Sequence, residues 1–89
     1  MTNIKVTRVS DSRFQVNVTE GRSQTDHVVT VTPSDLQRYG AGATAEGLVE
    51  ASFRFLLERE PKESILRTFE ISVIEGYFPE YPAEIRRRL

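Results

Sequence analysis

The sequence lacks cysteine and tryptophan, and it contains a single histidine, His27. Without cysteine the chain has no disulfide, no thiolate metal site and no cysteine nucleophile. One histidine does not make a histidine-rich metal site, and no serine stands in the G-x-S-x-G context of a nucleophile elbow. The glycines of YGAGATAEG match neither a phosphate-binding loop nor a dinucleotide fingerprint. We therefore expect no catalytic, cofactor-binding or metal-binding residues, and no enzymatic activity.

Long apolar runs are also missing. No stretch approaches the roughly 20 apolar residues that a membrane-spanning helix needs, and the start MTNIKVTRVSDSRF has no apolar segment typical of a signal peptide. These features predict a cytoplasmic protein. Neither sign of charge is in excess, because 12 lysines and arginines face 13 aspartates and glutamates. A general electrostatic attraction to nucleic acid is therefore not expected.

The length and composition indicate one folded domain. The 89 residues match a single small core, and 38% hydrophobic with 28% charged residues is outside the range typical of disordered chains. The patterns divide the chain in two. Residues 1–32 predict an antiparallel sheet and residues 33–89 a helical portion, which together make an α+β fold.

The sheet prediction rests on alternating side chains. Phe14, Val16 and Val18 alternate with polar residues, as in a strand with one dry and one wet face. Turn-forming breaks separate this strand from its neighbours, so we expect a three-stranded meander near residues 3–9, 13–20 and 24–32. In the third strand we assign Val29 and Val31 to the dry face. His27 then lies at the rim of that face, although a slip of one residue exchanges the two faces.

The second part of the chain predicts a short helix, one long helix and two or three short C-terminal helices. Thr32-Pro33 and Asp35 form a capping pattern for a helix that ends near Tyr39, and Gly40 is expected to be its left-handed C-cap. The apolar pattern of residues 45–60 predicts the long helix. Because proline cannot continue a helix, this one is expected to stop before Pro61 and a new short helix to begin there.

A charged cluster surrounds this proline, at Glu58, Arg59, Glu60, Lys62 and Glu63. Paired carboxylates become catalytic only when burial or close approach separates their pKa values, whereas a charge run beside a helix break is normally solvated. We interpret the cluster as a joint between helices and not as a site.

The segment Ser52 to Tyr81, SFRFLLEREPKESILRTFEISVIEGYFPEY, resembles a family of small uncharacterised bacterial proteins with a FLLEREP-x-x-SIL-x-x-F core followed by I-x-x-YFPEY. The resemblance covers the C-terminal half, and the strand portion matches only in pattern. It implies a bacterial, stand-alone domain and transfers no catalytic residue.

Candidate partner-binding residues lie near the C-terminus: Tyr77, Tyr81, Arg86, Arg87 and Arg88. Tyrosine offers contact area with a polar group, but large rings also close the core of a small domain. The three arginines either complement the end of a terminal helix or form a basic tail. The first hypothesis is thus a small protein-binding, regulatory or accessory module. The alternative is a nucleic-acid-binding or antitoxin-like regulator that uses the basic C-terminal segment.

Self-association as a homodimer is also predicted from the sequence. A three-stranded sheet has two edges with unshared backbone groups, and this chain places few lysines or prolines to block them. The helix of residues 45–60 is apolar around more than half of its circumference. We expect pairing through a strand edge or through the surplus apolar face of this helix. The competing outcome is a monomer in which Ile65, Leu66, Phe69, Ile74 and Phe78 cover the helix.

Overall fold

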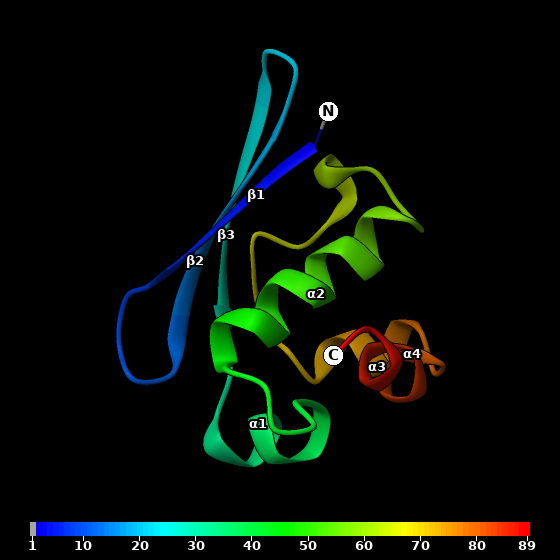
Figure 1. Cartoon of the computed structure of the whole chain (residues 1–89). Helices are drawn as coiled ribbons and strands as arrows, with labels where there is room; N and C mark the ends of the chain where they lie inside the picture. Colours follow the sequence, from blue (N-terminus) through cyan, green and yellow to red (C-terminus); the bar gives the residue numbers. More distant parts are fainter. Residues whose placement is uncertain (1) are drawn as a thin grey trace.

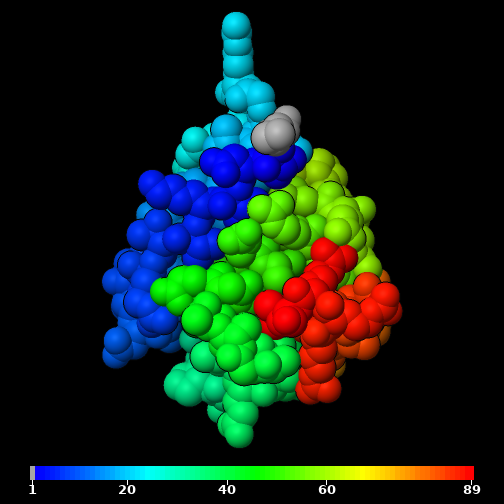
Figure 2. Space-filling view, in the orientation of Figure 1, coloured from blue at the N-terminus to red at the C-terminus, as the bar shows by residue number. Residues whose placement is uncertain are grey.

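The first third of the chain forms the antiparallel meander that the alternation predicts. In the computed structural model, which describes residues 2–89, the strands are β1 (Thr2–Arg8), β2 (Arg13–Glu20) and β3 (Ser23–Thr30). The β2–β3 hairpin turns through Gly21 at φ +60° and extends beyond the rest of the molecule (Figure 1). The space-filling view shows the same hairpin end standing out from the body (Figure 2). The predicted α+β fold class is confirmed.

The register around the histidine is confirmed as well. Val16 pairs with His27 and Phe14 with Val29, so these side chains share the dry face. The exposed fraction of His27 is 1%, and its ring meets that of Phe53 edge-on with 5.2 Å between centroids. His27 therefore lies within the core and not at its rim, because a helix covers this face of the sheet.

That helix is α2 (Ala45–Leu57), which lies across the sheet in Figure 1. Thr44 caps its first turn by accepting a hydrogen bond from the Gly47 amide at 3.0 Å. Its apolar residues are buried on two sides, against the sheet and against the C-terminal helices. Leu48, Val49, Phe53, Phe55 and Leu56 are all buried, while Glu50 and Arg54 face solvent and pair at 3.2 Å.

Helix α1 (Pro33–Tyr39) begins with the predicted capping box, in which Thr32 and Asp35 exchange hydrogen bonds. The prediction for its other end is wrong. Gly40 is right-handed, with φ −80°, and the positive φ angles lie at Ala41 and Gly42. Position 40 requires glycine for a steric reason, because a Cβ there would lie 2.5 Å from the Leu36 carbonyl oxygen.

The segment after Pro61 differs from the prediction of a short helix. A single 3-10 turn, η1 (Lys62–Ser64), leads into a fourth strand, β4 (Thr68–Glu70), parallel to β3. The sheet order is β1-β2-β3-β4, so one strand lies in the part expected to be helical. Phe69 and Ile71 are buried while Thr68 and Glu70 are exposed, which is strand alternation. The exposed edge of β3 supplied the hydrogen-bond partners that decided the conformation.

Two short helices complete the chain, α3 (Val73–Tyr77) and α4 (Tyr81–Arg88). Helix α4 packs against α2, α1 and α3, and in Figure 1 the three short helices lie below α2. They form the second cover that the apolar pattern of α2 requires. Within residues 2–89, no helix is long and apolar enough to cross a membrane.

The protonation state of His27 is set by its two hydrogen bonds. Its Nδ1 lies 2.7 Å from the Leu66 carbonyl oxygen, which only accepts, so Nδ1 carries the proton. Its Nε2 lies 2.8 Å from the Thr25 hydroxyl and accepts from it. The neutral ring thus ties β3 to the segment that enters β4.

We expect acid to destabilise the protein through His27. Burial lowers the pKa of His27 below its ordinary value of 6.5, against the opposing effect of the Leu66 hydrogen bond; nearby Arg67 lowers it further and Asp26 raises it. The unfolded chain therefore binds this proton more readily, and the free energy of unfolding should fall as the pH drops below 6.5 towards the folded-state pKa. Urea denaturation across this pH range measures the effect.

The control is His27→Gln, which retains the contributions of the carboxyl groups and lacks that of the imidazole. Its pH profile should be flatter than that of the wild type just below pH 6.5. Identical profiles would contradict the role given to the buried ring.

Candidate functional site

An apolar cleft lies between the C-terminal end of α2, the segment that enters β4, and α3. Its volume is about 130 Å³. Most of the lining side chains are aliphatic or aromatic, with a carboxylate and two hydroxyl groups among them. The lining residues are Leu56, Glu60, Ser64, Ile65, Leu66, Phe69, Val73, Ile74, Tyr77 and Phe78.

Two large apolar side chains of the cleft are open to solvent. The exposed fraction is 47% for Leu66 and 68% for Tyr77. Leu66 is held in place through its own carbonyl oxygen by the buried His27 ring, and Tyr77 is the last residue of α3. Exposed apolar groups on both sides of an apolar cleft are typical of binding surfaces.

Glu60 is the acidic group of the cleft. The turn after α2 places it there, with its amide donating to the Leu56 carbonyl oxygen at 2.9 Å. Within residues 2–89, its carboxylate has no ion pair and accepts no hydrogen bond from a side chain. Burial raises the pKa of Glu60 above the ordinary 4.5, because removal from water disfavours the charged form.

Its charged neighbours are arranged differently. Glu58 pairs with Arg88 at 2.6 Å, Arg59 pairs with Glu80 at 3.2 Å, and Lys62 pairs with Glu63 at 2.6 Å. For these residues the interpretation as a structural joint is supported. In the sequence, Glu60 is one of several neighbouring charges of both signs, so it could not be recognised as unpaired. Its lack of a partner depends on the position that the turn after α2 gives it.

The lining of the cleft has features of a binding site. Its hydroxyl groups belong to Ser64 and Tyr77. Within residues 2–89, neither hydroxyl makes a hydrogen bond to a basic side chain. In the same residues no group of acidic or histidine side chains is arranged to hold a metal ion. The arrangement can bury an apolar group and pair a cation with Glu60.

Of the two tyrosines predicted to bind a partner, the structure leaves only Tyr77 accessible. Tyr81 has no exposed surface, and its ring packs against those of Phe55 and Tyr39. The Ser52 hydroxyl donates to the Leu48 carbonyl oxygen, so the Tyr81 hydroxyl donates to Ser52 at 2.6 Å. Tyr81 is thus a core residue, and its place in the predicted binding surface is corrected.

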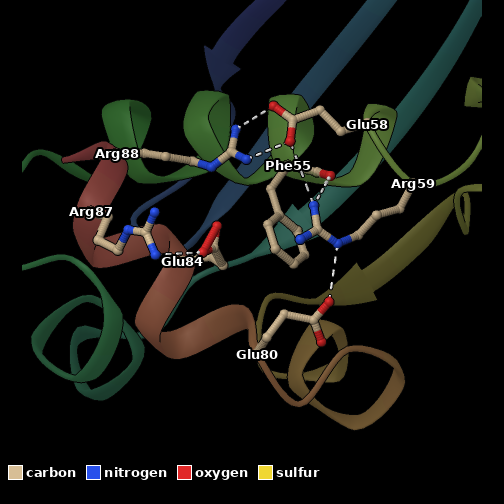
Figure 3. A network of polar contacts seen from close by, with 7 residues as sticks. All are labelled: Phe55, Glu58, Arg59, Glu80, Glu84, Arg87 and Arg88. Carbon is tan, nitrogen blue, oxygen red and sulfur yellow. Dashed lines mark hydrogen bonds and ion pairs between the residues drawn. The ribbon is translucent and has the colours of Figure 1, made fainter.

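The three C-terminal arginines contact the chain's own groups. Arg88 makes two hydrogen bonds to the Glu58 carboxylate, at 2.6 and 2.8 Å, and Arg87 pairs with Glu84 (Figure 3). Arg86 donates to the Arg38 carbonyl oxygen at 3.1 Å. Arg88 and Arg86 thus join α4 to the end of α2 and to α1, whereas Arg87 pairs within α4.

The arginine network also covers one aromatic ring. The guanidinium of Arg59 lies 3.6 Å from the centroid of Phe55, and that of Arg88 lies 5.6 Å from it. Arg59 donates both to the Phe55 carbonyl oxygen and to the Glu80 carboxylate (Figure 3). The end of α2, the loop that follows α3 and the start of α4 therefore meet at this ring. A separate basic surface for nucleic acid is therefore poorly supported here. Lys62, a basic residue of the charged cluster around Pro61, is 4% exposed and lies 3.5 Å from Glu20.

The basis for the predicted dimer changes with the structure. The apolar residues of α2 are buried within the chain, where the helix packs against β1, α4 and α1, while Leu66 faces solvent. The structure therefore leaves no surplus apolar face on α2 that would support a dimer through this helix. Strand β4 covers β3, so the edges of the sheet are now β1 and β4.

Comparison with known proteins finds no family model, no curated protein and no solved structure that matches the chain. The resemblance to small bacterial proteins stays a prediction, and the candidate site depends on the geometry of the chain itself.

Proposed function

We propose that the protein is a small non-catalytic module that binds a protein partner through the cleft beside β4. The observation that carries the proposal is the pair of exposed side chains, Leu66 and Tyr77, on either side of an apolar cleft. Water leaves this apolar surface when a partner covers it, which favours association. A module that binds a partner and catalyses no reaction would have a regulatory or accessory role.

Affinity capture from the source organism tests the proposal, with partners identified by mass. We expect a partner that the wild-type protein captures and that Leu66→Asp fails to capture, because a carboxylate in the apolar cleft is costly to desolvate. Val9→Asp is the matched control, since Val9 is also exposed, at 62%, and lies outside the cleft. Equal capture by all three proteins would contradict the proposed surface.

Self-association through a sheet edge is the remaining form of the predicted homodimer. Both β1 and β4 have an unpaired side, and symmetric pairing of one edge with itself would satisfy its backbone groups. Sedimentation equilibrium at micromolar concentrations should give a mass above that of one chain. A mass near 10.2 kDa throughout would contradict the dimer.

A further inference from the structure

We infer that the ligand of the cleft is an extended peptide that adds a strand to the free edge of β4 and places a lysine or arginine against Glu60. This inference depends on the proposed function, and it specifies the partner's conformation and charge. It combines three features of the described residues: the open edge of β4, the unpaired carboxylate, and the size of the apolar cleft.

The hydrogen bonds between β3 and β4 leave one side of β4 free. The Val28 amide donates to the Arg67 carbonyl oxygen at 2.7 Å, and the Ile71 amide donates to that of Thr30 at 3.0 Å. In a parallel pair, alternate residues of a strand point their backbone groups to the same neighbour. Residues 67, 69 and 71 therefore face β3, and Thr68 and Glu70 direct their amides and carbonyls away from it.

The free edge lies next to the cleft along the chain. Leu66, shortly before β4, and Phe69 within it line the cleft, whereas Thr68 and Glu70, whose backbone groups face away from β3, are not among the lining residues. A peptide that bonds to Thr68 and Glu70 continues the sheet and runs along the cleft. Strand addition of this kind takes its affinity from backbone hydrogen bonds and its specificity from alternate side chains that enter pockets.

The charge of the cleft selects a basic ligand. Glu60 is the single ionisable carboxylate among the lining residues, which include no lysine, arginine or histidine. A partly desolvated carboxylate without a partner gains more from an approaching cation than a solvated one does. An acidic ligand would face repulsion at the same place, so the cleft discriminates by sign.

The volume of the cleft admits one apolar side chain. A closed apolar cavity of about 150 Å³ binds benzene, and the cleft measures about 130 Å³. On an extended peptide, side chains two positions apart point to the same face. The ligand should therefore present an apolar residue and a basic residue with one residue between them, both facing the cleft.

Selection from phage-displayed random heptapeptides tests the inference. The wild-type protein is the bait, and clones that also bind Leu66→Asp are removed. We expect the remaining peptides to be enriched in the pattern of an apolar and a basic residue separated by one. Synthesised peptides of this pattern should lose at least about tenfold in affinity for Glu60→Gln, and Glu50→Gln on the solvent face of α2 should bind as the wild type does.

Amide hydrogen exchange of the complex tests the strand addition. The amides of Thr68 and Glu70 should become protected when the selected peptide binds, since they gain acceptors in the added strand. The amide of Phe69 already faces β3 and should change less. Two series of peptides, methylated at the odd-numbered or at the even-numbered backbone nitrogens, should differ. Only the series that blocks the nitrogens facing β4 should lose binding.

The outcomes separate this inference from the proposed function. Peptides that need Leu66 but show no basic preference, or bind without protecting Thr68 and Glu70, would overturn the inference and leave the binding module standing. If no peptide distinguishes the wild type from Leu66→Asp, both are overturned. Circular dichroism of each variant shows that loss of binding is not loss of folding.

Discussion

Replacement of Phe55 by alanine is expected to lower the free energy of unfolding by about 3–5 kcal/mol, the range typical of a deleted core phenylalanine. The side chain is fully buried. Its ring contacts those of Phe78 and Tyr81 edge-on, with centroids 5.8 and 5.3 Å away, and the guanidinium of Arg59 stacks on it. The cavity would therefore open where α2, α4 and the residue after α3 meet.

Urea denaturation monitored by circular dichroism measures this change. Leu57→Ala is a matched control on the same helix, because Leu57 is only half-buried and should lose less stability. Native domains are stable by only about 5–15 kcal/mol. A lower urea midpoint of the Phe55 variant, or its failure to fold, would therefore each confirm the prediction. An unchanged midpoint would show that this face of α2 is not in the core.

Replacement of Tyr81 by alanine should have an effect of similar size, about 3–5 kcal/mol. Its ring fills the junction between α2 and α4, and its hydroxyl bonds to Ser52 in the core. Burial raises the pKa of the Tyr81 hydroxyl, so the group stays protonated and keeps donating. Tyr81→Phe retains the ring and should cost about 1 kcal/mol, the usual value for one lost hydrogen bond.

Tyr77 provides a control for Tyr81, because it is a surface tyrosine and not a core one. Its side chain is mostly exposed, so Tyr77→Ala should change the free energy of unfolding by less than about 0.5 kcal/mol. The same variant should weaken partner capture, because Tyr77 lines the cleft. If Tyr81→Ala instead left stability intact and abolished capture, the division between core tyrosine and surface tyrosine would be wrong.

The first three strands and the first two helices follow from local patterns. Alternation over Phe14, Val16 and Val18 determines a strand with a dry face, and the choice of Val29 for that face predicted the register of β3 correctly. The capping box of Thr32 and Asp35 begins α1 as expected. These elements are predictable because each signal lies within a few residues and agrees with the burial that the fold supplies.

The candidate site was only partly predictable. Tyr77 was identified as a binding residue from its type and position, and it lines the cleft. Leu66 covers α2 in the competing monomer hypothesis, whereas in the structure it faces solvent at 47% exposure. Glu60 looked like one charge among several, since nothing in the order of residues distinguishes a paired carboxylate from an unpaired one.

By itself, the sequence determined an α+β domain with a meander, a capped short helix and a long helix that stops before Pro61. Proline lacks an amide hydrogen wherever it stands, so that stop needs no tertiary contact. Only the tertiary structure decided the conformation of residues 65–71, whose apolar spacing suits a helix or a strand. The open backbone groups of β3 selected the strand, and with it the cleft, the exposed Leu66 and the unpaired Glu60.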